Sequence, residues 1–458
     1  MTAARRASWN FALDAAAAWA RELRKPLLVF EALRCDYPWA SDRHHAFVLD
    51  GMRDNADTFA RRGVTYYPYV ERAPAGGKGL LAALAENAAV VIGDDYPAFV
   101  IPAQTAAAAR QLDVKLELID GNGLLPMHAT TQVFASAYAF RRYLQKTLAS
   151  HASATPARDA LRNVPSAPIC IPSRIRNRWK PGIPSTLARL PIDHAVAPTR
   201  HEGGTRAGRA RLAAFVRSSL SDYADGRRDA TREMTSGLSP YLHFGHISAH
   251  EVFAAVMRHA GWLGHLPVRG SGAREGWWGV DRAVEAFLDE LVTWRELGFN
   301  MCAHAPGYDR YESLPAWARA TLEDHQGDPR PHRCTQRAFE QAATHDPIWN
   351  TAQRQLLEDG RIHGYLRMLW GKKVLEWTRS PREALDILID LNNKYALDGR
   401  DPNSYSGIFW VFGRYDRPWP ERPIFGTVRY MSSASTARKG GLVQVKGQSA
   451  KVRSKGQG

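Results

Sequence analysis

The chain has 458 residues, of which 45% are hydrophobic, and this is enough for two or three domains with a sizeable core. Its 61 lysines and arginines outnumber 46 acidic residues, and the net charge of +15 favours a polyanionic partner such as nucleic acid, although a merely soluble basic protein has the same composition. No run of about 18 apolar residues predicts a membrane span, and the first residues contain no signal-peptide core. The four cysteines form no CxxC pair, which argues against a metal site or a disulfide framework and fits a cytoplasmic protein.

The first 135 residues alternate short apolar runs with alanine-rich stretches. The apolar runs at 26–32, 64–70, 89–93 and 114–120 predict buried strands, and the segments between them, such as 44–61 and 102–111, predict helices. This alternation is typical of a parallel sheet with helices on both faces. We therefore expect a Rossmann-like α/β domain over residues 1–135.

The rest of the chain divides into three further segments. Residues 136–205 are rich in proline and basic residues, which predicts a surface linker between domains. From 206 to 431, apolar residues recur at spacings of three and four, which predicts a helical domain. The expected helices lie at 209–223, 250–259, 283–298, 336–344, 351–359, 365–376 and 381–391. Residues 432–458 lack periodicity and predict a disordered basic tail.

Two segments of the helical domain combine polar and aromatic residues in patterns that suit ligand binding. Around 235–252, small hydroxyl residues and a glycine precede a helix, with Ser239 as its N-cap and Pro240 in its first turn. Backbone N–H groups at such a helix start would hold a diphosphate, although a simple capped helix has the same pattern. Around 287–300, Glu290 and Trp294 are four residues apart and share a helix face. That face suits a pocket for a base, or equally a core tryptophan beside a solvated carboxylate.

Tryptophan is the unusual residue of this chain, with nine of its 14 copies between Trp277 and Trp419. Trp370 and Trp377 are seven residues apart on one helix stripe, separated by roughly 10 Å, and Trp349 lies nearby in the sequence. Indoles at this spacing could carry an electron from the surface to a buried redox cofactor, although such a stripe is also typical of plain core.

The segment 391–431 combines a polar turn with a basic aromatic stretch. The turn DGRDPN is too polar for a core, and its Asp398 can pair with a buried arginine. The stretch that follows mixes cations with aromatic residues, which suits unpaired or splayed nucleic acid.

Together these segments resemble the photolyase/cryptochrome family, and specifically class II cyclobutane-pyrimidine-dimer photolyases. The resemblance covers most of residues 206–431 and is most specific in SGLSPYLHFGHIS, DELVTWRELGFN, THDPIWNTAQ, YLRMLWGKKVLEW and YALDGRDPN. The α/β pattern is similar to that family's antenna-type domain, but matches less closely. The resemblance implies FAD, active as FADH⁻, inside the helical domain, and leaves open a second, antenna chromophore of unknown identity.

The resemblance also assigns residues to the cofactor. Arg367 and Asp398 would form an ion pair beside the flavin ring, and Asn392 would lie near flavin N5, with Asn393 and Asn403 as close alternatives. The other residues that the resemblance places around FAD are Tyr223, Arg227, Thr235, Ser236, Gly237, Leu238, Ser239 and Asp401.

Further residues are assigned to the DNA and to electron transfer. Glu290 resembles the glutamate that contacts the dimer bases and, with Arg367, Asn392 and Asp398, forms the expected catalytic set. Trp294 and Trp410 would flank the flipped dimer, with Met368 packed against it. Arg417, Trp419 and Arg429 would fill the gap left in the duplex, and Trp349, Trp370 and Trp377 match the tryptophan chain that reduces the flavin under light.

The function that the resemblance implies is light-driven splitting of cyclobutane pyrimidine dimers in UV-damaged DNA, duplex or single-stranded, by a monomeric photolyase. A cryptochrome-like blue-light receptor would share FAD and the tryptophans, but needs no dimer pocket. A light-independent redox or DNA-binding flavoprotein would not need three such tryptophans. A (6-4) repair enzyme would carry a histidine at the pocket, whereas His243 and His246 lie in the FAD segment.

The sequence departs from the family at two places. The segment beginning at Met1 resembles the part of the family that follows its first strand, so that strand is missing. Either the start codon is assigned too late, which we favour, or the first domain lacks a central strand. Cys334 stands where the family usually has a tyrosine, which makes a tyrosine-dependent branch of electron transfer doubtful.

Overall fold

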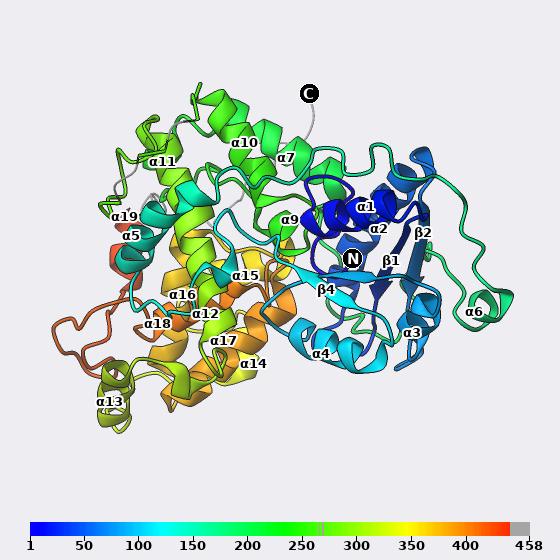
Figure 1. Cartoon of the computed structure of the whole chain (residues 1–458). Helices are drawn as coiled ribbons and strands as arrows, with labels where there is room; N and C mark the ends of the chain where they lie inside the picture. Colours follow the sequence, from blue (N-terminus) through cyan, green and yellow to red (C-terminus); the bar gives the residue numbers. More distant parts are fainter. Residues whose placement is uncertain (265, 268–269, 440–458) are drawn as a thin grey trace, which may run out of the picture.

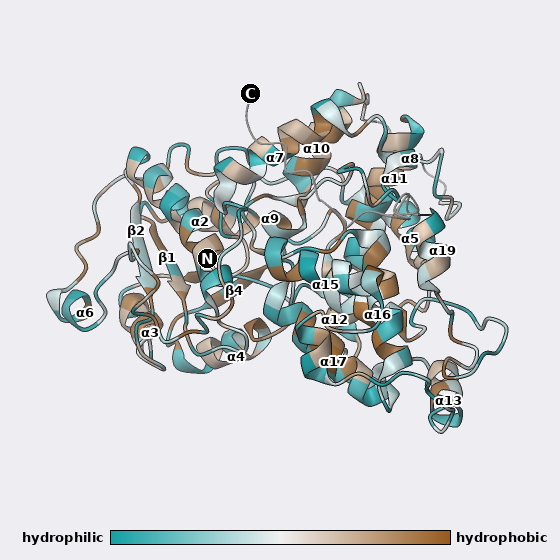
Figure 2. Ribbon diagram, turned by 180° about the vertical axis from the view of Figure 1, so that it is seen from behind, coloured by the Kyte–Doolittle hydropathy of each residue, from teal (hydrophilic) through white to brown (hydrophobic). Residues whose placement is uncertain are grey.

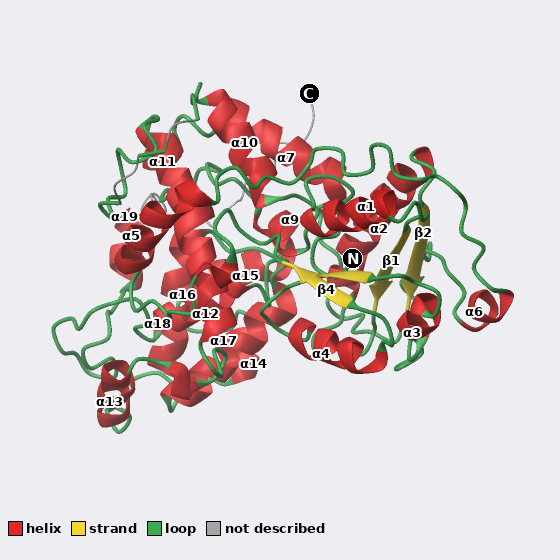
Figure 3. Ribbon diagram, viewed as in Figure 1, coloured by secondary structure: helices red, strands yellow, loops and turns green. Residues whose placement is uncertain are grey.

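The computed structural model describes residues 1–264, 266–267 and 270–439. An α/β part and a helical part lie side by side, and all the strands belong to the α/β part (Figures 1 and 3). The strands β1 (Leu28–Leu33), β2 (Thr65–Val70), β3 (Val91–Asp94) and β4 (Leu116–Ile119) lie within or one residue beyond the four apolar runs that predicted them. The helices of this part are α1 (Phe11–Glu22), α2 (Asp42–Arg61), α3 (Leu80–Ala85) and α4 (Ile101–Gln111).

The strands form two parallel pairs instead of the single sheet that the sequence predicts. β1 pairs with β2 and β3 with β4, and no other strand lies between the pairs in the described part of the chain. The first residues lie there instead (Figure 1): the Met1 ammonium donates to the Phe30 carbonyl at 2.8 Å, and the Thr2 and Ala3 N–H groups donate to the Asp94 carboxylate at 2.7 and 2.8 Å. These bonds link the two pairs without a ladder.

Several helices of the helical part begin where a side-chain oxygen accepts a backbone N–H. Asp346, Ser380 and Asp401 cap α15 (Pro347–Asp359), α17 (Pro381–Tyr395) and α18 (Pro402–Val411), and a proline follows each cap. Proline suits the first helical turn because its missing N–H has no partner there. The remaining helices are α7 (Gly204–Ser218), α8 (Tyr223–Gly226), α9 (Ser239–His243), α10 (Ala249–His259), α11 (Arg282–Leu288), α12 (Arg295–His304), α13 (Ala316–Asp324), α14 (Gln336–Glu340) and α16 (Gly364–Trp377).

Predicted helix boundaries differ from the structure at several places, by four or five residues at the ends of α7, α14, α15 and α17. The helix expected over 209–223 ends at Ser218, because a separate short turn, α8, begins at Tyr223. The helix expected over 283–298 is divided: a π-helical segment, η3 (Asp289–Trp294), separates α11 from α12. π-Helical turns inside α-helices frequently mark functional sites.

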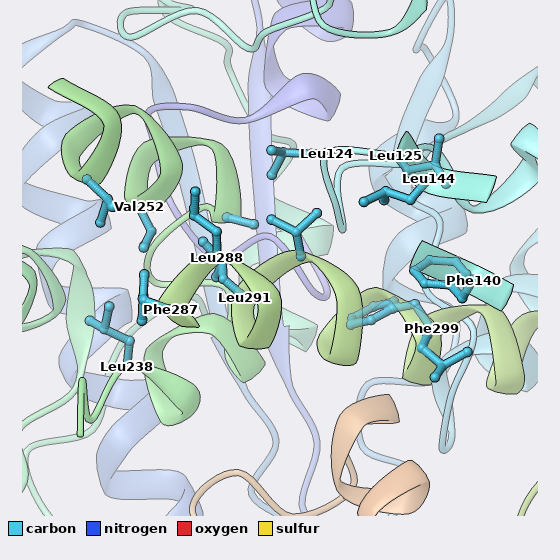
Figure 4. Close-up of a cluster of buried hydrophobic side chains, with 14 of the residues drawn as sticks. Leu124, Leu125, Phe140, Leu144, Leu238, Val252, Phe287, Leu288, Leu291 and Phe299 are labelled. Atoms are coloured by element: carbon cyan, nitrogen blue, oxygen red, sulfur yellow. The ribbon is translucent and has the colours of Figure 1, made fainter. Parts of the chain in front are cut away.

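The predicted linker 136–205 is wrong at its start, because α5 (Ala137–Thr147) packs into the helical part. Phe140 and Leu144 are buried in the same cluster as Leu288 and Leu291 (Figure 4). The guanidinium of Arg141 donates to both carboxylate oxygens of Asp289, at 2.7 and 2.9 Å. The later residues of the segment connect the two parts and carry α6 (Ser173–Arg178), which lies at the outer edge of the α/β part (Figure 1).

The expected disordered tail is wrong over its first part, since α19 (Ser433–Lys439) is helical, and residues 440–458 lie outside the described residues. Most helices carry apolar residues beside hydrophilic ones, as helices around a core do (Figure 2). α16 differs, because residues from Leu369 through Leu375 are buried almost without interruption. In the described ranges, no helix is both long and apolar enough to cross a membrane.

Candidate active site

Two arginines bracket the glycine turn that precedes α9. Arg211 of α7 donates from Nε to the Ser236 carbonyl at 2.6 Å and from Nη2 to the Thr235 carbonyl at 2.8 Å. A Cβ on Gly237, whose φ is +65°, would lie 2.7 Å from Arg211 Nε and 3.0 Å from Arg361 Nη1. Burial and the neighbouring Arg211 lower the pKa of Arg361, and Arg361 makes no ion pair with any described residue. Paired guanidiniums over an open glycine turn suit a diphosphate.

Ser239 and Leu238 have roles other than those predicted. Ser239 is the first residue of α9, whereas Leu238 occupies the cap position and makes no side-chain capping bond. The Ser239 hydroxyl contacts Asp398 instead. Leu238 is buried in the apolar core, so only its backbone can face a ligand.

The predicted ion pair between Arg367 and Asp398 is present. Arg367 Nη2 of α16 lies 3.0 Å from Asp398 Oδ1, and the two side chains are 26% and 13% exposed. Burial opposes the ionisation of Asp398, but Arg367 and the Ser239 hydroxyl outweigh it and hold the pKa of the carboxyl below its ordinary value. The pair therefore stays charged.

The three asparagines that could lie near flavin N5 differ in burial and in hydrogen bonding. Asn392 is buried, and its amide nitrogen donates to the Ser404 hydroxyl at 2.8 Å and to Asn393 Oδ1 at 3.2 Å, whereas its own oxygen accepts from no described residue. The Asn393 side chain is used within the protein, because its oxygen accepts the Arg400 N–H at 2.8 Å and its amide donates to the Tyr405 hydroxyl at 3.2 Å. Asn403 is exposed in the first turn of α18. Asn392 is therefore the best candidate for a contact to a buried cofactor.

Residues 399–402 of the polar turn are buried at the junction of the two parts, contrary to the expectation that the turn is too polar for a core. Arg400 and Asp401 are both buried. The Asp401 carboxylate caps α18, accepts the Tyr96 hydroxyl at 3.2 Å and lies 3.3 Å from His243 Nδ1. Because these protein groups occupy it, Asp401 holds the two parts together and is a poor candidate for the cofactor contact predicted for it.

Glu290 of η3 forms an ion pair with Arg227, the residue that follows α8. Arg227 Nη1 lies 2.6 Å from Glu290 Oε1, and Arg227 also lies over the ring of Tyr223, 5.8 Å from its centroid. The Glu290 side chain is 44% exposed, but the surrounding protein still raises the pKa of its carboxyl against the opposing effect of Arg227. Tyr223 packs edge-on against Phe287 in the core. Arg227, which was predicted to contact the cofactor, thus forms an ion pair with Glu290, which was predicted to contact the dimer.

Trp294 and Trp410 are in direct contact. Trp294 ends η3 and Trp410 lies in the last turn of α18, and their ring centroids are 4.6 Å apart with planes at 18°. Met368 is half-buried on α16, one residue after Arg367. The structure therefore brings together the two indoles predicted to flank a ligand.

A separate exposed cluster combines Arg417, Trp419 and Arg429. The guanidinium carbons of Arg417 and Arg429 lie 6.0 and 5.1 Å from the Trp419 ring centroid, and Trp419 is 39% exposed. The Trp419 indole N–H donates to Asp416 at 3.1 Å, and its backbone N–H donates to the Thr427 carbonyl at 2.8 Å. An exposed indole between two cations suits a nucleic-acid surface.

The three predicted chain tryptophans form one continuous path. Trp349 stacks on Trp370 with centroids 6.4 Å apart, and Trp349 also contacts Trp377 at 6.2 Å. The sequence predicted a Trp370–Trp377 stripe, whereas Trp349 from α15 lies between them. Trp377 is only 3% exposed, so the expected outer end of the path does not reach the surface.

Cys334 and two histidines surround this outer end. The Cys334 N–H donates to the Trp377 carbonyl at 2.9 Å. The His345 ring lies 4.5 Å from Trp377 and stacks on His332 at 3.7 Å.

Known proteins resemble this chain over most of its length. The chain is 34% identical over 444 residues to the deoxyribodipyrimidine photo-lyase of Methanothermobacter thermautotrophicus, which covers 96% of this chain and 91% of the relative. It is 34% identical over 450 residues to the deoxyribodipyrimidine photo-lyase of Oryza sativa, which covers 94% and 82%. A solved cryptochrome from Synechocystis sp. PCC6803 shares the fold, with a TM-score of 0.68 at 13% identity over 96% of this chain and 84% of that one. No family model matches the chain.

The fold, the site and these relatives show that the chain belongs to the photolyase/cryptochrome family. Within it, the chain is an enzyme of the deoxyribodipyrimidine photo-lyase class, a flavoprotein of a family that binds FAD. The residues fit that cofactor: Arg211, Arg361 and the Gly237 turn suit its diphosphate, and the Arg367–Asp398 pair and the buried Asn392 are polar groups that could contact its ring system. Sequence reasoning missed Arg211 and Arg361, because isolated arginines in a basic chain carry no motif.

Proposed function

We propose that this enzyme uses light to split cyclobutane pyrimidine dimers in UV-damaged DNA, as a class II photolyase does. The observation that supports this most is the Arg227–Glu290 ion pair, which joins residues assigned to the cofactor with residues assigned to the dimer. Direct electron transfer between cofactor and dimer requires the two sites to adjoin.

The cofactor side of the proposed site uses four side chains. Arg211 and Arg361 would bind the FAD diphosphate, and the charged Arg367–Asp398 pair and the Asn392 amide would orient its ring system. Bound FAD, in its reduced form FADH⁻, supplies the electron when it absorbs light.

The DNA side of the proposed site receives the dimer outside the duplex. Enzymes that act on a base take it out of the stack, and the cost is lowest for a damaged base that stacks poorly. Trp294 and Trp410 would hold the extruded dimer, while Glu290 hydrogen-bonds its base edge and stabilises the dimer radical anion until the ring opens. Arg417, Trp419 and Arg429 would fill the gap in the duplex.

Illumination of the purified protein with damaged DNA tests this function. Reduced, FAD-loaded protein is mixed with DNA that contains either cyclobutane dimers or (6-4) photoproducts, and each lesion is counted by chromatography after light and after darkness. We expect light-dependent loss of cyclobutane dimers in single- and double-stranded DNA and no loss of (6-4) photoproducts. Loss of the (6-4) photoproducts alone, or loss of neither lesion, contradicts the proposal.

A light-signalling receptor is the second candidate, because the buried Trp370–Trp349–Trp377 path would serve it equally well. The exposed Arg417–Trp419–Arg429 cluster favours repair, since it suits a disrupted duplex. We expect the repair enzyme to act as a cytoplasmic monomer.

A further inference from the structure

The buried position of Trp377 leaves the tryptophan path without an exposed donor. Trp370, Trp349 and Trp377 are all fully buried or nearly so. An electron taken from Trp377 must therefore be replaced through a neighbouring side chain.

Lys373 lies between Trp377 and a half-buried tyrosine, Tyr430. Its ammonium nitrogen lies 5.6 Å from the Trp377 ring centroid and 5.1 Å from the Tyr430 ring centroid. Both rings thus adjoin one ammonium group, and the separation of their centroids cannot exceed the sum of these two distances. The ammonium also donates to the Tyr430 hydroxyl at 3.5 Å, and Tyr430 is half-buried at the edge of the cluster that contains all three tryptophans. A phenol can reduce an indole radical cation by giving up one electron together with its proton.

We propose that Tyr430 is the terminal electron donor of this path, which rests on the proposed light-driven function. After a photo-oxidant of the flavin class has taken an electron from the path, Trp377 is an indole radical cation. Tyr430 transfers one electron to it, the phenolic O–H bond breaks, and the proton passes to water at the half-buried ring. Trp377 is restored, and a soluble thiol later reduces the neutral tyrosyl radical by one electron and one proton.

The charges around the two rings favour this direction of transfer. A positive charge on the Trp377 indole lies beside the Lys373 ammonium, and like charges repel. A tyrosyl radical is neutral because its proton has left, so neither Lys373 nor Arg422, whose guanidinium carbon is 5.4 Å from the Tyr430 centroid, opposes its formation. Glu376, 2.5 Å from the Lys373 ammonium, moderates this repulsion.

Tyr395 provides a matched control. It is also half-buried at the edge of the same cluster and also has a lysine over its ring, since Lys394 lies 5.2 Å from its centroid. Its hydroxyl donates to Glu340, and none of the three path tryptophans contacts its ring. Cys334 and His345, which adjoin Trp377, are the competing acceptors of the oxidising charge and of the indole proton.

Flash photolysis of the full-length, oxidised, FAD-loaded protein tests the proposal. The radicals are identified by transient absorption and by electron paramagnetic resonance with ring-deuterated tyrosine, in the wild type and in Tyr430→Phe, Tyr395→Phe and Cys334→Ala variants. We expect a tyrosyl radical in the wild type, Tyr395→Phe and Cys334→Ala proteins, and its loss in Tyr430→Phe with a longer-lived tryptophan radical. FAD absorbance at the same ratio to protein confirms that each variant is folded.

Three results would overturn the proposal: a wild type that forms only tryptophan radicals, a Tyr430→Phe variant that keeps the tyrosyl signal, or loss of the signal in a control variant. Dimer loss with chemically pre-reduced wild-type protein is measured in parallel. If that protein repairs dimers but forms no tyrosyl radical, the role of Tyr430 is wrong and the proposed repair function stands. If it repairs none, the repair function itself is wrong.

Discussion

The indoles of Trp294 and Trp410 lie nearly face to face, with centroids 4.6 Å apart and planes at 18°. Aromatic layers stack at roughly 3.5 Å, so a base between two indoles needs about 7 Å between them. The pair must therefore separate before it can hold an extruded dimer. A Cβ on Gly298 would lie 2.8 Å from the Asn403 Cα, which shows that the α12 and α18 backbones are in close contact near this pair. We expect the indoles to separate by side-chain rotation, with little movement of the helices.

Replacing Trp410 should weaken binding of damaged DNA specifically. Stacking of a base on an aromatic side chain contributes about 1–3 kcal/mol to binding. The Trp410→Ala variant loses this contribution, but it no longer has to separate the Trp294–Trp410 pair, and this offsets part of the loss. We expect roughly tenfold weaker binding of a dimer-containing oligonucleotide and unchanged binding of the undamaged one, measured by fluorescence anisotropy. Trp19→Ala, in the α/β part, is the control. Equal weakening for both oligonucleotides would show that Trp410 does not contact the dimer.

Removing the carboxyl group of Glu290 should impair repair more than binding. Gln keeps the size of the side chain and can still donate a hydrogen bond, but it cannot pass a proton towards the dimer's radical anion as a protonated carboxyl can, and positioned groups of this kind are commonly worth a factor of roughly ten or more in rate. We expect Glu290→Gln to bind dimer-containing DNA almost as tightly as the wild type, with about tenfold fewer dimers split per absorbed photon. Glu358→Gln, exposed on α15, is the control. An unchanged yield per photon removes Glu290 from the mechanism.

Truncating Arg361 should release the cofactor. A hydrogen bond to a charged group contributes about 1.5–3 kcal/mol, so Arg361→Ala should bind FAD roughly ten- to a hundredfold more weakly. Calorimetric titration of FAD into the apoprotein measures this directly. Arg354→Ala, exposed on α15, should leave FAD affinity unchanged. Wild-type FAD affinity in Arg361→Ala would place the diphosphate elsewhere.

Much of this site could be predicted because its residues lie in local patterns. The seven-residue spacing of Trp370 and Trp377, the polar turn that contains Asp398, and the four-residue spacing of Glu290 and Trp294 are all visible along the chain. The structure brings Arg367 to Asp398 at 3.0 Å, and it joins the tryptophans into one path. Spacing alone did not assign roles to these residues, and the predicted roles came from the resemblance of the motifs, in their order along the chain, to the photolyase/cryptochrome family.

The remaining features depend on contacts that are distant in sequence. Arg211 and Arg361, 150 residues apart in the sequence, both adjoin Gly237, and Trp349 belongs to a different helix from Trp370 and Trp377. The burial of Arg400 and Asp401 could not be predicted either, because a polar turn reads as solvent-exposed unless its partners, here Tyr96 and His243, are known. The arrangement of the strands in two separate pairs could not be predicted either, because apolar runs indicate where strands lie but not which strands pair.

The exposed cations beside Trp419 should determine part of the salt dependence of DNA binding. Each phosphate contact on duplex DNA contributes about 0.9 to the slope of log affinity against log salt concentration. We expect Arg417→Gln and Arg429→Gln each to reduce this slope by about 1. Arg176→Gln, on α6 at the outer edge of the α/β part, should leave it unchanged (Figure 1). The reverse result would place the DNA across α6.

Buried Lys372 should make stability rise with pH above neutrality. Burial lowers the pKa of Lys372 from 10.5 to about 7, and its ammonium donates to the Val411 carbonyl. Between about pH 7 and 10.5, the unfolded chain binds a proton at this lysine that the folded chain does not. The free energy of unfolding therefore increases with pH in this window, by at most about 1.4 kcal/mol per pH unit, and this contribution is absent below pH 7, where both states are protonated.

Urea unfolding of the wild type and of Lys372→Met at pH 7, 8 and 9 measures this contribution. We expect the difference in unfolding free energy between the two proteins to change in favour of the wild type as the pH rises. A difference that is constant across the three pH values would mean that Lys372 is charged in the folded protein.

The most direct test of the repair function is the number of cyclobutane dimers that remain after illumination. Purified, FAD-loaded protein is reduced and given dimer-containing DNA, and the dimers are counted against light dose, in parallel with a dark sample and with protein from which FAD has been removed. We predict that dimers disappear in proportion to blue-light dose only in the illuminated, FAD-loaded sample. An unchanged dimer count in that sample, with FAD bound and reduced, would contradict the account.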